Sequence, residues 1–303
     1  MKKFLSFMMV ALLMFTCTAC AEEYVVKASA PSGAPALALA ALAVDAPENY
    51  TFVAAETISA EFANGTADFI IAPVNAGAKL YTMGKSTYKL AAVVSWGNLF
   101  IASQKENFTL EDLNGATVTL FGENTINAAV VNYAFAQNGI TPGSVEYLAG
   151  AANTQSLLLT DENAIVVTAE PALTAAKMKN DKITAYAVND LYKAATGYDG
   201  YTQAALFVKA ETIQAQPEAV KAFLAQVEEA CAKATDDIEA VAAAAVTLEI
   251  LPNQKVAVAA IPGCAIRYVS ALEAREQIEF TANIDLTQFG GAVPADDFYY
   301  VAE

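Results

Sequence analysis

Residues 68–98 read DFIIAPVNAGAKLYTMGKSTYKLAAVVSWGN, and this stretch decides the fold. Its apolar start, Phe69–Ala72, is too short for an exposed helix and predicts a buried strand that stops at Pro73. Apolar residues at helical spacing follow, up to a glycine at position 84 that is suited to end a helix. A second apolar run, Lys89–Trp96, predicts another buried strand. The stretch is therefore a βαβ unit, in which a helix joins two parallel strands.

The pattern of strand, polar turn and helix recurs on both sides of this unit. Strands are expected before it at Tyr24–Ala28 and Tyr50–Ala54, with a helix at about 36–45 between them. After a crossover at Trp96–Ser103, the pattern predicts strands at 116–120, 145–148, 164–168, 183–188 and 203–209 and a helix at 126–137. From residue 216 onward the chain is expected to be almost wholly helical. The fold class is α/β, with two doubly wound lobes joined by a hinge.

The lobe boundaries follow from this order of elements. Lobe 1 is expected to comprise residues 24–98 plus 200–303, and lobe 2 residues 99–199. A chain of 303 residues is long enough for two such units. Since no linker rich in Gly, Ser or Pro sets off a third domain, the C-terminal helices are expected to pack on lobe 1.

The first 20 residues, MKKFLSFMMVALLMFTCTAC, have the pattern of an export signal. Two lysines precede an apolar segment, and small residues follow it. Its end, Thr18-Ala19-Cys20, resembles the lipobox of bacterial lipoproteins, in which the cysteine is lipid-modified, although Cys17 stands where an aliphatic residue is usual. Lipidation of Cys20 and conventional cleavage both stay open. Either way, the mature protein is expected to be extracytoplasmic, and lipidation would anchor it to the cell membrane.

Composition excludes several classes of function. The formal charge is −16, and it becomes −18 without Lys2 and Lys3, when 15 basic residues face 33 acidic ones. Such an acidic chain is not expected to bind nucleic acid. The chain has no histidine, which removes histidine-dependent catalysis and histidine-bearing metal sites. We therefore expect no enzyme activity, no metal site and no cofactor.

Two cysteines, Cys231 and Cys264, follow the signal segment. Cys231 lies in an expected long helix, and Cys264 is expected at a helix start after Pro262-Gly263. An oxidising compartment would allow one disulfide between them, and two separately buried thiols are the alternative.

Four motifs together resemble a known family. They are the strand and turn at 64–81, Trp96-Gly97-Asn98, Glu170-Pro171, and GGAVPADDFYY at 290–300. In this order they are similar to the nitrate/sulfonate/taurine-type and thiamine-pyrimidine-type substrate-binding proteins of ABC importers, with the type II periplasmic binding-protein fold. The resemblance covers the chain from about residue 24 to its end.

The resemblance implies capture of a small molecule between two lobes and its delivery to an ABC permease in the membrane. A monomer is expected. A ligand-sensing surface receptor is the alternative function, because the same lobes serve that purpose equally well. An enzyme on the same fold is a further alternative, although the related pyrimidine synthases consume a histidine, which this chain lacks.

The turns after the expected strands supply the candidate ligand-binding residues, because open α/β sheets bind ligands at the carboxyl ends of their strands. Helix N-termini at these turns suit polar or anionic groups. The candidates are Ser29, Pro31, Ser32, Gly33, Asn75, Ala76, Trp96, Gly97, Asn124, Thr125, Glu170 and Arg267.

Several candidates have a structural alternative. The polar residues of the turns are also suited to cap helices, namely Ser29, Ser32, Asn75, Asn124 and Thr125. Trp96 is also suited to fill the interface between the lobes. Glu170 is also suited to a salt bridge or a capping role, and Arg267 to pairing with a surface carboxylate.

The scarcity of arginine bears on the ligand. No candidate turn carries an arginine fork, which favours a neutral or weakly charged planar molecule over a dianion. A cationic heterocycle, such as a thiamine-precursor pyrimidine, becomes attractive if Glu170 faces the cleft.

Overall fold

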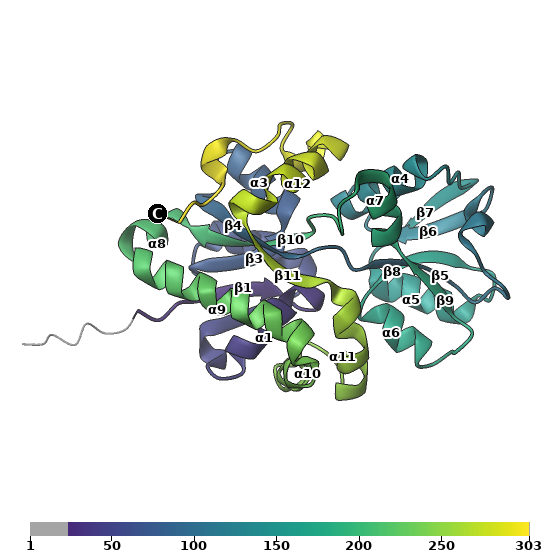
Figure 1. The fold of residues 1–303 in the computed structure, drawn as a ribbon, viewed down its shortest axis with the longest axis horizontal. Coiled ribbons are helices and arrows are strands. Elements are labelled where there is room, and N and C mark those ends of the chain that lie inside the picture. Colours follow the sequence, from purple (N-terminus) through teal and green to yellow (C-terminus); the bar gives the residue numbers. More distant parts are fainter. Residues whose placement is uncertain (1–23, 303) are drawn as a thin grey trace, which may run out of the picture.

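The computed structural model describes residues 24–302, which form two β-sheets, each with its own helices (Figure 1). The six-stranded sheet has the order β11-β4-β10-β3-β1-β2, and the five-stranded sheet has the order β7-β6-β8-β5-β9. The larger sheet consists of β1 (Ala28–Pro31), β2 (Tyr50–Val53), β3 (Phe69–Pro73), β4 (Tyr88–Ser95), β10 (Ala204–Lys209) and β11 (Ile266–Ser270). The smaller sheet consists of β5 (Leu99–Ser103), β6 (Thr117–Phe121), β7 (Ser144–Leu148), β8 (Ile165–Ala169) and β9 (Thr184–Ala187).

Helices cover both sheets (Figure 1). Apolar side chains of the helices and strands together form the core. The helices around the larger sheet are α1 (Leu37–Ala43), α2 (Ile58–Asn64), α3 (Val74–Thr82), α8 (Ala210–Ala215), α9 (Pro217–Asp236), α10 (Ile238–Thr247), α11 (Gln254–Ala260) and α12 (Ala271–Ile284). Those around the smaller sheet are α4 (Ile126–Gln137), α5 (Ala151–Thr160), α6 (Ala172–Lys177) and α7 (Val188–Thr196). Among residues 24–302, no helix is long and apolar enough to cross a membrane.

The decisive stretch forms β3, α3 and β4, as predicted. Its two strands run in the same direction, but they are not neighbours: β10 lies between them and is antiparallel to both. The prediction that Asn75 caps the helix is wrong, since Pro73 occupies the cap position and Asn75 is the second helical residue. A proline suits a helix start because the first N–H groups have no partner within the helix.

Three other expectations about elements are wrong. The first strand begins at Ala28 rather than at Tyr24, whose hydroxyl instead donates a 2.6 Å hydrogen bond to Asp68. The Trp96–Ser103 crossover contains strand β5, which joins the smaller sheet. The C-terminal part, expected to be almost wholly helical, also contains strand β11, which pairs antiparallel with β4 at the edge of the larger sheet.

The chain passes between the two sheets in two crossing segments. The first crossing, Trp96–Asn98, joins β4 to β5, and the second crossing, residues 197–203, leads back from α7 to β10. All strands of the larger sheet thus come from residues 28–95 and 204–270, and those of the smaller sheet from residues 99–187. The lobe boundaries 24–98 plus 200–303 and 99–199 remain a proposal, which this distribution supports.

The predicted signal segment, with the lipidation site Cys20, lies outside the described residues. Cys231 and Cys264 are both buried free thiols, so they form no disulfide with each other. Of the two alternatives, that of two separately buried thiols is confirmed. Cys264 ends a short 3-10 turn before β11 rather than starting a helix. Burial raises the pKa of the Cys231 thiol to about 12 and that of Cys264 further, which keeps both thiols protonated and unreactive near neutral pH.

Candidate functional site

A cleft of about 270 Å³ lies between the elements of the two sheets. The carboxyl ends of β1 and β3 form one wall, and the first turn of α4 forms the other. Both crossing segments contribute to its floor. Its lining residues are Pro31, Ser32, Pro35, Ala55, Pro73, Asn75, Ala76, Asn98, Thr125, Ile126, Asn127, Gln203, Ala204 and Gln288.

Local sequence explains how these walls form. Pro31 and Pro73 end β1 and β3 at the same edge of the sheet, and both strands run in the same direction. On the opposite wall, the Thr125 hydroxyl caps α4 by accepting a hydrogen bond from the backbone N–H of Ala128. The cap fixes the first turn of α4, so that Asn127 faces the cleft.

The described side chains that line the cleft are all uncharged. Asparagine, glutamine, serine and threonine supply its polar groups, while proline, alanine and isoleucine supply its apolar surface. Such a lining can bind a ligand by hydrogen bonds and apolar contact, but it offers no counter-charge to an ion.

A chain of carboxamides with a defined orientation forms the floor. The Asn98 Nδ2 donates to the backbone carbonyl of Glu170 at 3.0 Å, so the Oδ1 of Asn98 must be an acceptor. Gln203 Nε2 donates to this oxygen at 2.9 Å, while Gln203 Oε1 accepts from Ser95 at 3.1 Å. Because the chain starts at a backbone carbonyl, which can only accept, the orientation of each following amide is determined.

The same chain leads to Asn127 on the wall of α4. Its Oδ1 accepts from the Tyr201 hydroxyl at 2.9 Å and, at the outer limit of 3.5 Å, from Gln203 Nε2. The acceptor of Asn127 is thereby occupied, and its Nδ2 group is left as the donor for a ligand.

Asn75 lies opposite, in the first turn of α3. Its Oδ1 is shielded from water and accepts no hydrogen bond from any described residue. A buried amide oxygen without a donor is destabilising by about 1–3 kcal/mol. A ligand that makes this amide rotate and form a hydrogen bond would relieve that cost.

The cleft brings together only part of the predicted set, namely Pro31, Ser32, Asn75, Ala76 and Thr125. Four predicted residues of the turns lie outside its lining. Ser29 is buried and donates to Glu61, Gly33 has a φ of 105° in the turn before α1, Gly97 packs inside the first crossing, and Asn124 is exposed before the cap of α4.

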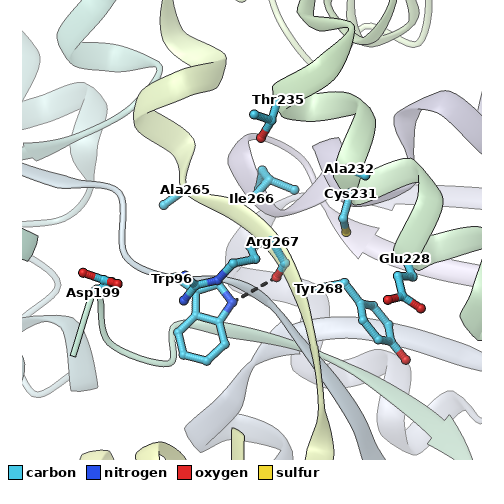
Figure 2. A pocket seen from close by; sticks show the side chains of 10 residues that line it. All are labelled: Trp96, Asp199, Glu228, Cys231, Ala232, Thr235, Ala265, Ile266, Arg267 and Tyr268. Carbon is cyan, nitrogen blue, oxygen red and sulfur yellow. Dashed lines mark hydrogen bonds between the residues drawn. The ribbon is translucent and has the colours of Figure 1, made fainter. Parts of the chain in front are cut away.

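Trp96 and Arg267 lie together at a second cavity of about 390 Å³, beside the crossings (Figure 2). The Trp96 indole N–H donates to the backbone carbonyl of Arg267 at 2.9 Å, and the Arg267 guanidinium lies 4.5 Å from the centre of the indole ring. Asp199 and Glu228 contribute negative charge to the same cavity. The two predicted residues thus contact each other, away from the cleft lining.

Glu170 lines a third cavity, of about 480 Å³, between α6 and the 3-10 turn that ends at Cys264. Its carboxylate accepts from the backbone N–H of Thr174 at 3.1 Å and from the Thr174 hydroxyl at 2.8 Å. Burial raises the pKa of Glu170, and the two hydrogen bonds partly oppose this shift. Only its backbone carbonyl serves the cleft, through Asn98.

Sequence reasoning missed Asn98, Asn127, Gln203 and Gln288. Gln203 precedes β10, which runs antiparallel to β3, so the amino end of β10 lies at the carboxyl end of β3. The sequence held a signal for Asn98, since it completes the Trp-Gly-Asn motif after a buried strand. The sequence gives no such signal for Asn127, because Asn127 lies inside its helix, two residues after the cap residue, and not in the turn.

Known structures share this architecture. An ABC transporter from Parabacteroides distasonis is 21% identical, with a TM-score of 0.79 over 92% of this chain and 99% of that chain. The periplasmic aliphatic sulphonate binding protein SsuA from Escherichia coli is 15% identical, with a TM-score of 0.70 over 92% of each chain. The ligand-binding component of an ABC-type import system from Staphylococcus aureus is 12% identical, with a TM-score of 0.68 over 92% of this chain and 97% of that chain.

These likenesses confirm the predicted type II periplasmic binding-protein fold. No curated protein sequence matches the chain. The family model described as NMT1/THI5 like matches residues 54–241, from the end of β2 to the start of α10. Since this match spans more than half of the sequence, the chain belongs to the NMT1/THI5-like family.

Proposed function

We propose that this protein is the extracytoplasmic solute-binding component of an ABC importer, and that it holds a small uncharged polar molecule in the cleft. The observation that carries the proposal is a cleft built from both lobes whose described lining is rich in carboxamides and uncharged. The similar structures from P. distasonis and S. aureus, an ABC transporter and a component of an ABC-type import system, support the transport role.

The uncharged lining argues against an anionic ligand. The E. coli relative is a sulphonate-binding protein, but among the described lining residues here no arginine or lysine is present to pair with a sulfonate. Moving an anion from water into such a site costs several kcal/mol unless charge or many N–H donors compensate.

A cationic ligand also lacks support. Its predicted partner, the Glu170 carboxylate, lies at the third cavity and bonds to Thr174. A planar neutral molecule that offers both donors and acceptors fits Asn75, Asn127 and the apolar surface of the prolines best.

We also propose roles for the signal segment and for Cys20 in placing the protein beside its permease. The signal segment exports the protein, Cys20 takes a lipid that anchors it to the cell membrane, and the monomer delivers its ligand to an ABC permease. Ligand contacts from both lobes would stabilise a closed arrangement, which the permease recognises.

We propose binding without catalysis. The chain has no histidine, and the thiols of Cys231 and Cys264 are buried with raised pKa values. Binding alone would also suit a sensor. Neighbouring genes for a permease and an ATPase would support import, whereas a neighbouring sensor kinase would support sensing.

A thermal-shift panel tests the ligand class. Uncharged cyclic amides and pyrimidines are compared with taurine, nitrate and bicarbonate and with cationic thiamine-precursor pyrimidines. A bound compound at a hundred times its Kd should raise Tm by about 5 °C, given about 2.7 kcal/mol of stabilisation and about 280 folded residues. Stabilisation by the anions alone would overturn the proposal.

Two asparagines on α4 provide a matched pair of variants. Asn127→Ala removes a cleft donor, whereas Asn132→Ala removes an exposed amide that contacts the Tyr147 hydroxyl at 3.2 Å. The Tm shift with the best uncharged compound should fall in the first variant and persist in the second. Equal shifts in both variants would place the ligand elsewhere.

A further inference from the structure

Asn189, the second residue of α7, binds the backbone of the first crossing. Its Nδ2 donates to the carbonyl of Trp96 at 2.9 Å and to the carbonyl of Gly97 at 3.0 Å. Both hydrogens of the amide are thus used on two successive carbonyls of the segment that joins the sheets. One side chain of lobe 2 therefore fixes the path of the chain as it leaves lobe 1.

Two glycines let the crossings approach this amide. Gly97 has a φ of 86°, and a Cβ there would lie 2.6 Å from Cε1 of Tyr201 and would also collide with Oδ1 of Asn189. Gly200, in the second crossing, has a φ of 152°, and a Cβ there would collide with the carbonyl of Trp96. The two crossings therefore meet at van der Waals contact, with the Asn189 amide packed between them.

The other half of the amide is not satisfied. Oδ1 of Asn189 is buried and accepts no hydrogen bond from any residue between 24 and 302. Such an acceptor opposes stability, so the favourable part of the side chain is its pair of bonds to the crossing. The Asn189 side chain is therefore better suited to fix the path of the first crossing than to increase the overall stability of the protein.

We propose that Asn189 is a positioning residue of the hinge: its two bonds hold the first crossing in place and so contribute to the angle between the lobes and to the width of the cleft. The importance of that width rests on the proposed function, but the geometric role does not. Rotation about the backbone bonds of Trp96 and Gly97 would move their carbonyls away from Nδ2, so the two bonds oppose a change of lobe angle at these residues. Loss of these bonds should free the hinge without altering the lining of the cleft.

The chain offers a close control for this test. Asn138, at the C-terminal end of α4, also donates from Nδ2 to two backbone carbonyls, those of Ala134 at 2.8 Å and Leu191 at 2.9 Å. Its acceptors lie in α4 and α7, both within lobe 2. Asn189→Ala and Asn138→Ala therefore delete the same kind of contact, and only the first deletion touches a crossing.

Hydrogen exchange of the ligand-free protein reads out the hinge directly. The N–H of Trp96 bonds to Ala265, and the N–H of Gln203 in the second crossing bonds to Ser95 at 3.0 Å. In Asn189→Ala, exchange in both crossings should accelerate roughly tenfold or more, as expected for the loss of two hydrogen bonds. Small-angle scattering should show a larger radius of gyration, and acrylamide should quench Trp96, the only tryptophan, more strongly.

Asn138→Ala should leave the exchange of the crossings and the radius of gyration unchanged. Asn189→Asp supplies a second test, since it keeps the shape of the side chain and replaces the donor by a carboxylate oxygen that faces two carbonyls. If Asn189→Ala does not fold, Asn189→Asp decides the question, and faster hydrogen exchange in its crossings would support the proposal. Unchanged hydrogen exchange of the crossings in the folded Asn189 variants would overturn the proposal. A freed hinge together with failure of every uncharged ligand would refute the proposed function and leave the hinge role intact.

Discussion

Replacing Gln203 by glutamate tests whether the carboxamide chain has the orientation described. Gln203→Glu keeps the size of the side chain and exchanges Nε2 for a carboxylate oxygen. That oxygen would face Oδ1 of Asn98, 2.9 Å away in the native pair, and Oδ1 of Asn127, at 3.5 Å. Ser95 would still donate to the other oxygen. The change therefore turns one strong and one weak hydrogen bond into contacts between acceptors.

The expected loss of unfolding free energy is about 2–4 kcal/mol. Loss of the neutral bond to Asn98 contributes about 1 kcal/mol, and an unsatisfied acceptor on the buried Asn98 contributes about 1–3 kcal/mol more. For about 280 folded residues this corresponds to a decrease of about 3–7 °C in Tm. Repulsion raises the pKa of the new carboxyl, so the loss should shrink near pH 4, where protonation restores a donor.

Urea denaturation followed by the fluorescence of Trp96 gives the free energies at pH 7 and pH 4. Gln214→Glu, at an exposed position of α8, is the matched control for the added charge. Equal effects of the two variants at pH 7 would refute the orientation, because a reversed amide chain would present a donor to position 203.

Other perturbations test separate parts of the structure. Burial raises the pKa of Glu170 above its unfolded value. The folded protein therefore loses stability as the pH rises from the unfolded pKa through the folded pKa, and the loss is complete above the folded pKa. Glu170→Gln should stabilise the protein at pH 7, with a gain that vanishes near pH 4, as measured by denaturation at both pH values. A thiol reagent should label Cys231 and Cys264 only after denaturation, and rapid labelling of the folded protein in mass spectrometry would contradict their burial. The Phe280 ring of α12 makes edge contacts with three tyrosine rings of α4, α7 and the second crossing, at centroid distances of 5.7–6.3 Å. Phe280→Ala should therefore lower the free energy of unfolding by about 3 kcal/mol, as measured by urea denaturation. Phe280→Leu should lower it by about half as much.

Local signals sufficed for much of the fold. The helix expected at 126–137 has those bounds in the structure, because a capping threonine precedes it and Asn138-Gly139 follows. The strands on either side of α3 were likewise predictable from short apolar runs. The position of β10 between β3 and β4 was not, since it depends on pairing between segments more than 100 residues apart. The edge strand β11 has no fully buried residue after Ile266, since Arg267 is exposed and Tyr268, Val269 and Ser270 are only partly buried, so it lacks the continuous apolar run of a central strand.

The candidate site, too, was only partly predictable from local sequence. Pro31, Asn75 and their neighbours follow parallel strands, and a general rule about strand ends placed them at the cleft. Gln203 stands at the amino end of its strand, where that rule gives no signal. Its position at the cleft follows only from the antiparallel insertion of β10, which local sequence does not reveal.

The central position of β10 also bears on the order in which the protein can fold during synthesis. All five strands of the smaller sheet, β5–β9, are present once residue 187 has been made, whereas the larger sheet still lacks β10 and β11. Without β10, β3 and β4 have no partner on their facing edges. The smaller sheet can therefore form completely before residues 204–270, which complete the larger sheet, have been made. A chain that stops near residue 200 should contain a complete smaller sheet and a larger sheet that lacks β10 and β11.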